Sequence, residues 1–202
     1  MPLADATRRL LAGRPEPALR SFLDAWPRPA PRRPDTPASL PVVEWLAKIS
    51  PPLPLRLGTP PVDTPPHGAA LVATLSAAAP QLAWRQTYRA GTMPAHFMAN
   101  YGWSELIGPR GRLASDQFAC GFLLLGPRTL YPCHSHEARE FYIPIFGEAE
   151  WQQGDGVWRS RAPGTLIVHA SEETHAMRTA AQPLVALYLW QSANLAQSAQ
   201  LV

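Results

Sequence analysis

The sequence contains few cysteines, a single lysine and no long apolar segment. Its two cysteines, Cys120 and Cys133, cannot build a disulfide framework in a chain of 202 residues. The longest apolar run, from Phe118 to Gly126, has the length of a strand and falls short of the roughly 18 apolar residues that a membrane-spanning helix needs. Residues 1–13 carry acidic and arginine side chains without a continuous apolar stretch, which argues against a secretory signal. We therefore expect a cytoplasmic protein with no membrane partner.

Basic charge is concentrated in the first part of the chain. Residues 1–60 carry eight Arg and one Lys against five acidic residues, whereas residues 61–202 carry nine Arg against ten acidic residues. The formal net charge of +3 therefore comes from the front end. Because this charge is neither dense nor interleaved with aromatic side chains, we expect no nucleic-acid partner.

Proline is distributed just as unevenly, since 16 of the 24 prolines lie in residues 1–66. Helical spacing of apolar residues occurs between these prolines, and proline-rich stretches over 27–41 and 50–66 are typical of extended links. We predict that residues 1–111 form an α-helical, proline-rich region that packs on the rest of the molecule. The segments with a helical pattern are 3–26 (interrupted at Pro15 and Pro17), 39–49 and 69–79.

After residue 112 the pattern changes to short β-type runs separated by turn signals. Gly126-Pro127, Gly154-Asp155-Gly156 and Pro163-Gly164 punctuate this part of the chain. Strands at such close and regular spacing indicate an all-β sandwich or barrel over residues 112–202. The predicted strands are 117–125, 140–146, 148–153, 157–160, 165–168 and 184–190.

Histidines gather in the same β region. His134 and His136 are two residues apart, so on a strand both imidazoles point to one face, and Glu140 shares that face by even spacing. Gly147 allows a tight turn, and a neighbouring strand can return His175 to the same centre. A lone His-x-His pair is commonly a polar strand face, but the longer pattern is more specific. Imidazole and carboxylate ligands suit zinc, iron, manganese, cobalt or nickel, and an open coordination position would make the site catalytic.

The spacing from His134 and His136 through Glu140 to Gly147 resembles the first motif of the cupin superfamily, and Pro163-Gly164 with His175 resembles the second. The resemblance covers about residues 115–190. It implies a mainly β fold, a cupin (double-stranded β-helix or jelly-roll) barrel with an α-helical N-terminal extension. By the cupin pattern, the metal ligands are His134, His136, Glu140 and His175.

A narrower resemblance extends to three longer segments, residues 100–111, 123–144 and 174–190. These segments look like the cupin-type dimethylsulfoniopropionate (DMSP) lyases, which cleave a zwitterionic substrate to dimethyl sulfide and acrylate. In that family a tyrosine two residues after the motif glutamate is implicated as the base, which here is Tyr142. A second tyrosine lies upstream of the motif histidines, which here is Tyr131.

The family commonly has Pro-Ala-Glu where this chain has Glu137-Ala138-Arg139 between His136 and Glu140. The departure leaves the motif ligands in place and changes the local charge, so it bears on which substrate is bound. The first histidine of the motif is a less certain ligand in some members. The resemblance alone makes a homodimer a candidate assembly.

Aromatic side chains can hold a sulfonium group by cation–π attraction. Candidates for substrate binding on the β-strands are Trp190, Tyr188 and Trp151, each of which can alternatively be core packing. His169 is the fourth candidate of this set, as an outer partner of the site, and can alternatively be a loop histidine. A different cupin metalloenzyme acting on a small carboxylate, such as a dioxygenase or an isomerase, and a non-catalytic cupin that binds a small ligand are the alternatives. On this interpretation the front end is peripheral, and removing residues 1–38 leaves metal binding intact.

Overall fold

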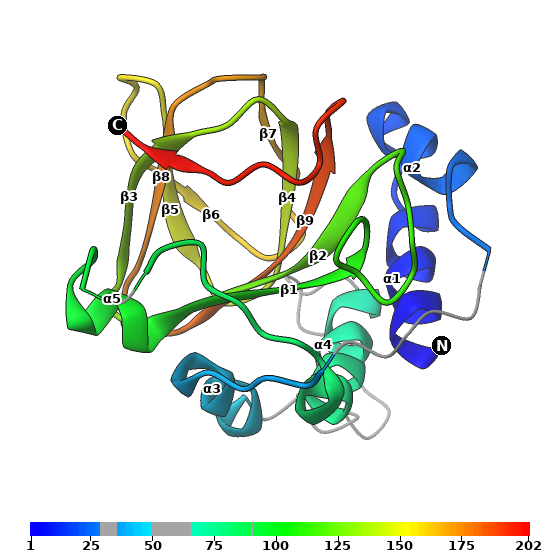
Figure 1. Ribbon diagram of the computed structural model, residues 1–202, viewed down its shortest axis with the longest axis horizontal. Coiled ribbons are helices and arrows are strands. Elements are labelled where there is room, and N and C mark those ends of the chain that lie inside the picture. The colour runs from blue at the N-terminus through cyan, green and yellow to red at the C-terminus, as the bar shows by residue number, and fades with distance from the viewer. Residues whose placement is uncertain (29–35, 50–65, 90) are drawn as a thin grey trace.

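The computed structural model describes residues 1–28, 36–49, 66–89 and 91–202. Residues 29–35 of the first predicted proline-rich link (27–41) and residues 50–65 of the second (50–66) lie outside these ranges. Two five-stranded antiparallel sheets face one another and form the barrel, and helices pack beside one of them (Figure 1). This confirms the predicted mainly β fold with N-terminal helices.

Both sheets combine strands from distant parts of the sequence. The first sheet, in spatial order, consists of β1 (Tyr101–Ile107), β2 (Ala119–Leu125), β9 (Leu184–Gln191), β4 (Arg139–Phe146) and β7 (Ile167–His169). The second consists of β10 (Gln200–Leu201), β3 (Leu130–Ser135), β8 (His175–Thr179), β5 (Ala149–Gln153) and β6 (Arg159–Arg161). The turn between β4 and β5 requires Gly147, which has φ +77° and whose added Cβ would lie 2.0 Å from the Pro183 carbonyl oxygen.

Strand β1 lies inside residues 1–111, the region predicted to be α-helical, but outside its three predicted helical segments. Residues 101–107 pair with β2 along the edge of the first sheet, with a bulge between Glu105 and Ile107. The predicted division of the chain at residue 111 remains a prediction, but a strand of the barrel precedes it. The aromatic and apolar residues of 81–107 follow neither a helical nor a strand period, so local sequence does not fix the conformation of residues 101–107. Their pairing with β2 does.

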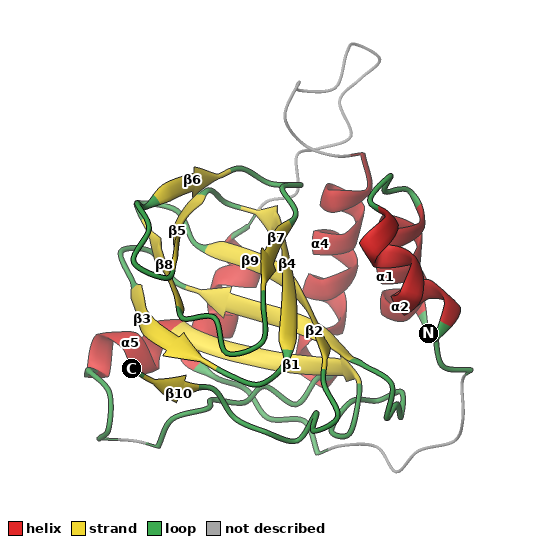
Figure 2. Cartoon of the chain, turned by 90° about the horizontal axis from the view of Figure 1, so that it is seen from above, coloured by secondary structure: helices red, strands yellow, loops and turns green. Residues whose placement is uncertain are grey.

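Helices from the first 78 residues pack against the outer face of the first sheet (Figure 2). Pro2 opens the first helix, where its missing N–H costs no hydrogen bond, and Pro15 and Pro17 separate it from the second. The helices are α1 (Pro2–Ala12), α2 (Arg20–Asp24), α3 (Glu44–Lys48), α4 (Pro66–Ala78) and α5 (Ala95–Asn100), with 3₁₀ turns at Pro17–Leu19, Pro41–Val43 and Ala79–Gln81. No helix within the described ranges is long and apolar enough to cross a membrane.

Strand β4 divides the apolar interior into two clusters. Phe141 and Ile143 pack outward in the cluster that contains the side chains of α1 and α2. Tyr142 belongs to the second cluster, between the two sheets. Side chains alternate between the two faces of β4, so one face packs against the helices and the opposite face carries Glu140.

Candidate active site

Three strands bring the predicted histidines and glutamate together between the sheets. His136 directly follows β3, Glu140 is the second residue of β4, and His175 opens β8. Nε2 of His136 lies 3.0 Å from Oε2 of Glu140, and Nε2 of His175 lies 3.2 Å from the same oxygen. All three side chains are buried. Their potential ligand atoms lie within 4.8 Å of one another, which places a carboxylate and two imidazoles around one point.

Backbone carbonyls fix how these imidazoles face the cluster. Nδ1 of His136 lies 2.9 Å from the carbonyl oxygen of Ala138, and Nδ1 of His175 lies 2.9 Å from that of Glu173. When Nδ1–H donates to a carbonyl, Nε2 keeps the lone pair that a metal requires. Nε2 of both rings consequently faces Glu140, and an unprotonated Nε2 can offer its lone pair to a cation bound there.

Charge within the cluster is balanced between the carboxylate and the imidazoles. Burial alone would raise the pKa of Glu140, but the charge and hydrogen bond of His136, together with the charge of His175, hold it well below its usual range. Burial likewise opposes protonation of His136, but Glu140 raises its pKa. The pair therefore favours imidazolium beside carboxylate, and a cation binding at Nε2 would release that proton.

The donor set fits a divalent transition metal. Nε2 of His175 is buried and makes no acceptable hydrogen bond within the described chain. A buried nitrogen without a partner is costly unless something occupies the adjacent point, and a metal would do so. His136, Glu140 and His175 are the residues that can hold it.

His134 lies beside this cluster and is not one of its three members. It pairs with His175 across β3 and β8, and the two rings meet edge to face at 4.2 Å. Burial, together with the charge of His175, lowers the pKa of His134 to about 3. The ring is therefore neutral.

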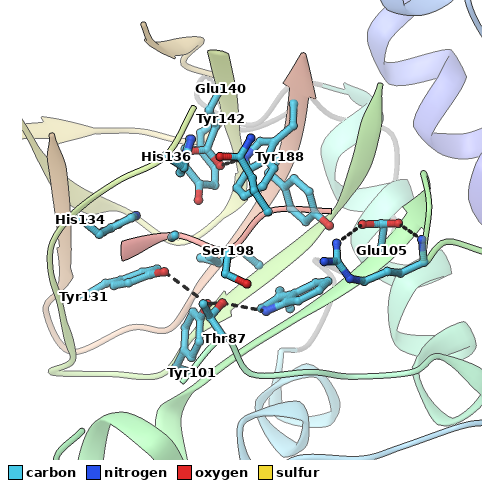
Figure 3. A pocket seen from close by; sticks show the side chains of 16 residues that line it. Thr87, Tyr101, Glu105, Tyr131, His134, His136, Glu140, Tyr142, Tyr188 and Ser198 are labelled. Atoms are coloured by element: carbon cyan, nitrogen blue, oxygen red, sulfur yellow. Dashed lines mark hydrogen bonds and ion pairs between the residues drawn. The ribbon is translucent and has the colours of Figure 1, made fainter. Parts of the chain in front are cut away.

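Both predicted catalytic tyrosines line the cavity that opens onto the cluster (Figure 3). Burial and the charge of Glu140 hold the pKa of Tyr142 well above 10. Burial and the neighbouring phenol of Tyr101 do the same for Tyr131. Without a cation at the cluster, both hydroxyls are neutral.

The four predicted substrate-binding residues divide into two pairs. Trp190 and Tyr188 line the cavity, and the indole N–H of Trp190 donates to Oε1 of Glu140 at 2.6 Å. Trp151 and His169 are buried and do not line it. His169 instead stacks on His175 with ring centroids 3.9 Å apart, so it contacts the cluster from behind.

Several residues of the cavity are absent from the sequence-based prediction. Thr87, Tyr101, Glu105 and residues 197–199 also line the cavity. A signal for Tyr101 and Glu105 was present, because they lie in the 100–111 segment that carries the family resemblance. Thr87 and residues 197–199 lie in segments without any motif, so only folding reveals them.

A two-sheet barrel with buried His and Glu side chains at its centre defines the cupin class. The family model of the dimethylsulfoniopropionate lyases matches residues 22–186. The chain is 34% identical to dimethylsulfoniopropionate lyase DddQ of Ruegeria pomeroyi over 87% of its own length and 81% of that protein. The chain therefore belongs to the dimethylsulfoniopropionate lyase family.

Two solved structures support the same assignment. A crystal structure from work on the DMSP lyases RdDddP and RnDddQII matches with a TM-score of 0.84 and 26% identity, over 100% of this chain and 96% of that one. The crystal structure of DMSP lyase DddQ from Ruegeria pomeroyi matches with a TM-score of 0.77 and 31% identity, over 98% and 96% of the two chains. Both matches include the N-terminal helices as well as the barrel.

Proposed function

We propose that the protein cleaves dimethylsulfoniopropionate to dimethyl sulfide and acrylate by base-catalysed β-elimination. The observation that carries the proposal is the convergence of the His136–Glu140–His175 cluster and two tyrosines on one cavity, in a chain of this family. A small carboxylate with a cationic end is the substrate class that these groups fit.

We assign the metal to the three-residue cluster His136, Glu140 and His175, with His134 as a neighbour. A bound divalent cation would supply Lewis acidity that disperses the negative charge developing beside the substrate carboxylate. The ligand types accept zinc, iron, manganese, cobalt or nickel, so the native metal must be measured.

The elimination needs a base next to the carbon that bears the substrate carboxylate. In the proposed step Tyr142 takes the proton from this carbon, the C–H electron pair becomes the C=C bond of acrylate, and the C–S electron pair leaves with dimethyl sulfide. Tyr142 suits this role because it follows Glu140 by two residues and faces the same cavity. Positive charge beside Glu140 opposes the effect of this carboxylate and favours the tyrosinate.

Aromatic side chains provide the place for the sulfonium end. Tyr188 and Trp190 line the cavity and stand 6.2 Å apart, ring to ring. Their ring faces can attract a cation without any hydrogen bond, at about 0.5–2 kcal/mol. Trp151 lies behind Tyr142, with ring centroids 6.0 Å apart, and can support that ring. His169 supports His175 in the same way.

Headspace analysis of the metal-loaded protein incubated with DMSP tests the proposal. We expect stoichiometric dimethyl sulfide and acrylate from the wild type, and loss of most turnover in Tyr142→Phe with metal content unchanged. Absence of dimethyl sulfide with each of the five metals would overturn the proposed function. The predicted homodimer remains a separate proposal, which light scattering of the same preparation can test.

A further inference from the structure

The hydroxyl of Tyr131 lies at the end of a hydrogen-bonded chain that begins at Trp103, on strand β1 in the wall of the cavity. The indole N–H of Trp103 donates to Oγ1 of Thr87 at 3.2 Å, and Thr87 is joined to the Tyr101 hydroxyl at 2.8 Å. The Tyr101 hydroxyl lies 3.3 Å from that of Tyr131 (Figure 3). Tyr88 donates to the same Tyr131 oxygen, also at 3.3 Å.

Backbone pairing explains why Thr87 reaches Tyr101. Arg85 and Trp103 exchange both backbone hydrogen bonds in an antiparallel bridge, with N···O distances of 2.8 and 2.9 Å. In an antiparallel pair, the residue two positions after Arg85 lies opposite the residue two positions before Trp103. Thr87 therefore comes opposite Tyr101. The amide of Gln86 also donates to the Tyr101 carbonyl oxygen at 2.8 Å, which fixes the segment along β1.

The direction of the chain follows from the chemistry of its first member. An indole N–H can only donate, so Thr87 accepts from Trp103 and its own proton is free for Tyr101. The Tyr101 hydroxyl can then donate a hydrogen bond to the Tyr131 oxygen. Hydrogen bonds arranged head to tail in this way strengthen one another. With Tyr101 and Tyr88 both donating to it, the Tyr131 oxygen has its acceptor positions filled. Its own proton is left to point into the cavity.

The ring of Tyr131 is held as firmly as its hydroxyl. It stacks on His134 with centroids 4.0 Å apart and meets Tyr101 edge-on at 4.9 Å. The side chain is 2% exposed. A buried phenol fixed at both ring and oxygen is a preorganised donor for an anionic group in the cavity.

We propose that Thr87 and Tyr101 are positioning residues that act through Tyr131, orienting its hydroxyl to donate to the carboxylate of the substrate. This inference rests on the proposed function and assigns distinct roles to the two tyrosines, with Tyr142 as the base and Tyr131 as the donor. Trp103 sets the direction of the chain from the cavity wall.

Isosteric removal of single hydroxyls tests the proposal. We expect Thr87→Val and Tyr101→Phe each to raise KM for DMSP by about 2- to 10-fold, the range of one hydrogen bond, with a smaller change in kcat. Thr87→Ser keeps the hydroxyl and should restore the wild-type value. Thr92→Val serves as the matched control. It removes a hydroxyl that donates to the Arg89 carbonyl oxygen and takes no part in the hydrogen bonds that lead to Tyr131.

A double-mutant cycle separates action through Tyr131 from a direct role. The Tyr101→Phe effect should disappear in a Tyr131→Phe background, because the group that it orients is gone. An undiminished Tyr101→Phe effect in that background would overturn the proposal, as would wild-type behaviour of both Thr87→Val and Tyr101→Phe. Failure of Thr87→Ser to restore function would also overturn it.

Acrylate binding keeps this test independent of turnover. The product carries the same carboxylate, so titration of the metal-loaded protein with acrylate should show the same 2- to 10-fold weakening in Thr87→Val and Tyr101→Phe. If the wild type cleaves no DMSP, the proposed function fails while acrylate affinity still decides whether these residues position Tyr131. Equal acrylate affinity in all variants would overturn the positioning role alone.

Discussion

The imidazole of His134 stacks on the phenol ring of Tyr131, with centroids 4.0 Å apart and planes inclined by 10°. Nδ1 of His134 lies 2.8 Å from the Pro132 carbonyl oxygen, which holds the ring in this position. The same histidine that the motif offers as a ligand therefore supports the second tyrosine of the cavity. The contribution of His134 to metal binding can therefore be tested separately from that of His175.

Metal content should distinguish these two histidines. His175→Ala removes one of three ligand groups, so we expect its metal stoichiometry to fall well below one per chain. His134→Ala should keep stoichiometric metal, with an affinity loss of no more than the about 10- to 100-fold typical of outer partners. Elemental analysis after dialysis measures both. Equal loss of metal in the two variants would make His134 a ligand.

Removing the Phe22 side chain should destabilise the whole protein. Phe22 is 0% exposed and meets Phe118 and Phe141 edge to face at 5.3 and 5.2 Å. A buried Phe→Ala change costs about 3–5 kcal/mol of unfolding free energy. Urea titration of Phe22→Ala measures this loss, with Val157→Ala, at a 71% exposed position, as the control that should stay near wild type.

The same packing bears on the prediction that residues 1–38 are dispensable for metal binding. Phe22 covers the outer side of Phe141, and Phe141 is the neighbour of Glu140 on β4. Truncation would expose this face of the first sheet to water. We therefore expect the shortened chain to lose stability and, with it, metal.

Glu105 should make stability depend on pH. Burial raises the pKa of this carboxyl above 4.5, more than its bonds to Arg110 lower it. The folded state therefore binds a proton more readily than the unfolded state, and the corresponding stability is present below pH 4.5 and lost as pH rises through the folded pKa. Glu105→Gln cannot titrate and should lack this loss.

Urea midpoints of the wild type and Glu105→Gln at pH 4, 5 and 8 measure the effect, because other titrating groups are common to both proteins. The variant should gain stability relative to the wild type as pH rises. A difference that is constant across these pH values would contradict the assigned direction.

Arg110 should control access to the cavity. Arg110 lines the cavity, and its guanidinium donates to the carbonyl oxygens of Leu195 and Ala196, which precede the cavity-lining residues 197–199. Arg110→Ala leaves these carbonyls without their charged donor and should loosen the segment. We expect KM for DMSP to rise by about 2- to 10-fold, the scale of one or two hydrogen bonds, and limited proteolysis near residue 195 to accelerate. Unchanged proteolysis and KM would remove Arg110 from this role.

Local sequence signals determined much of this protein. The turn at Gly147, the helix over residues 69–79 and the interruption at Pro15 and Pro17 all occur as predicted, because each depends on neighbouring residues alone. Spacing and resemblance likewise predicted a group of His134, His136, Glu140 and His175, of which the last three lie around one point.

Tertiary structure alone decided which alternating residues share a point in space. The pairing of β3 with β8 shifts register between Tyr131 and His134, so period-two counting along β3 does not fix where His134 faces. Strand β1 exists because β2 offers it an edge, and Thr87 reaches Tyr101 only through the bridge to β1. Such contacts join residues far apart in the chain, and their geometry depends on sheet register and loop closure rather than on the local sequence.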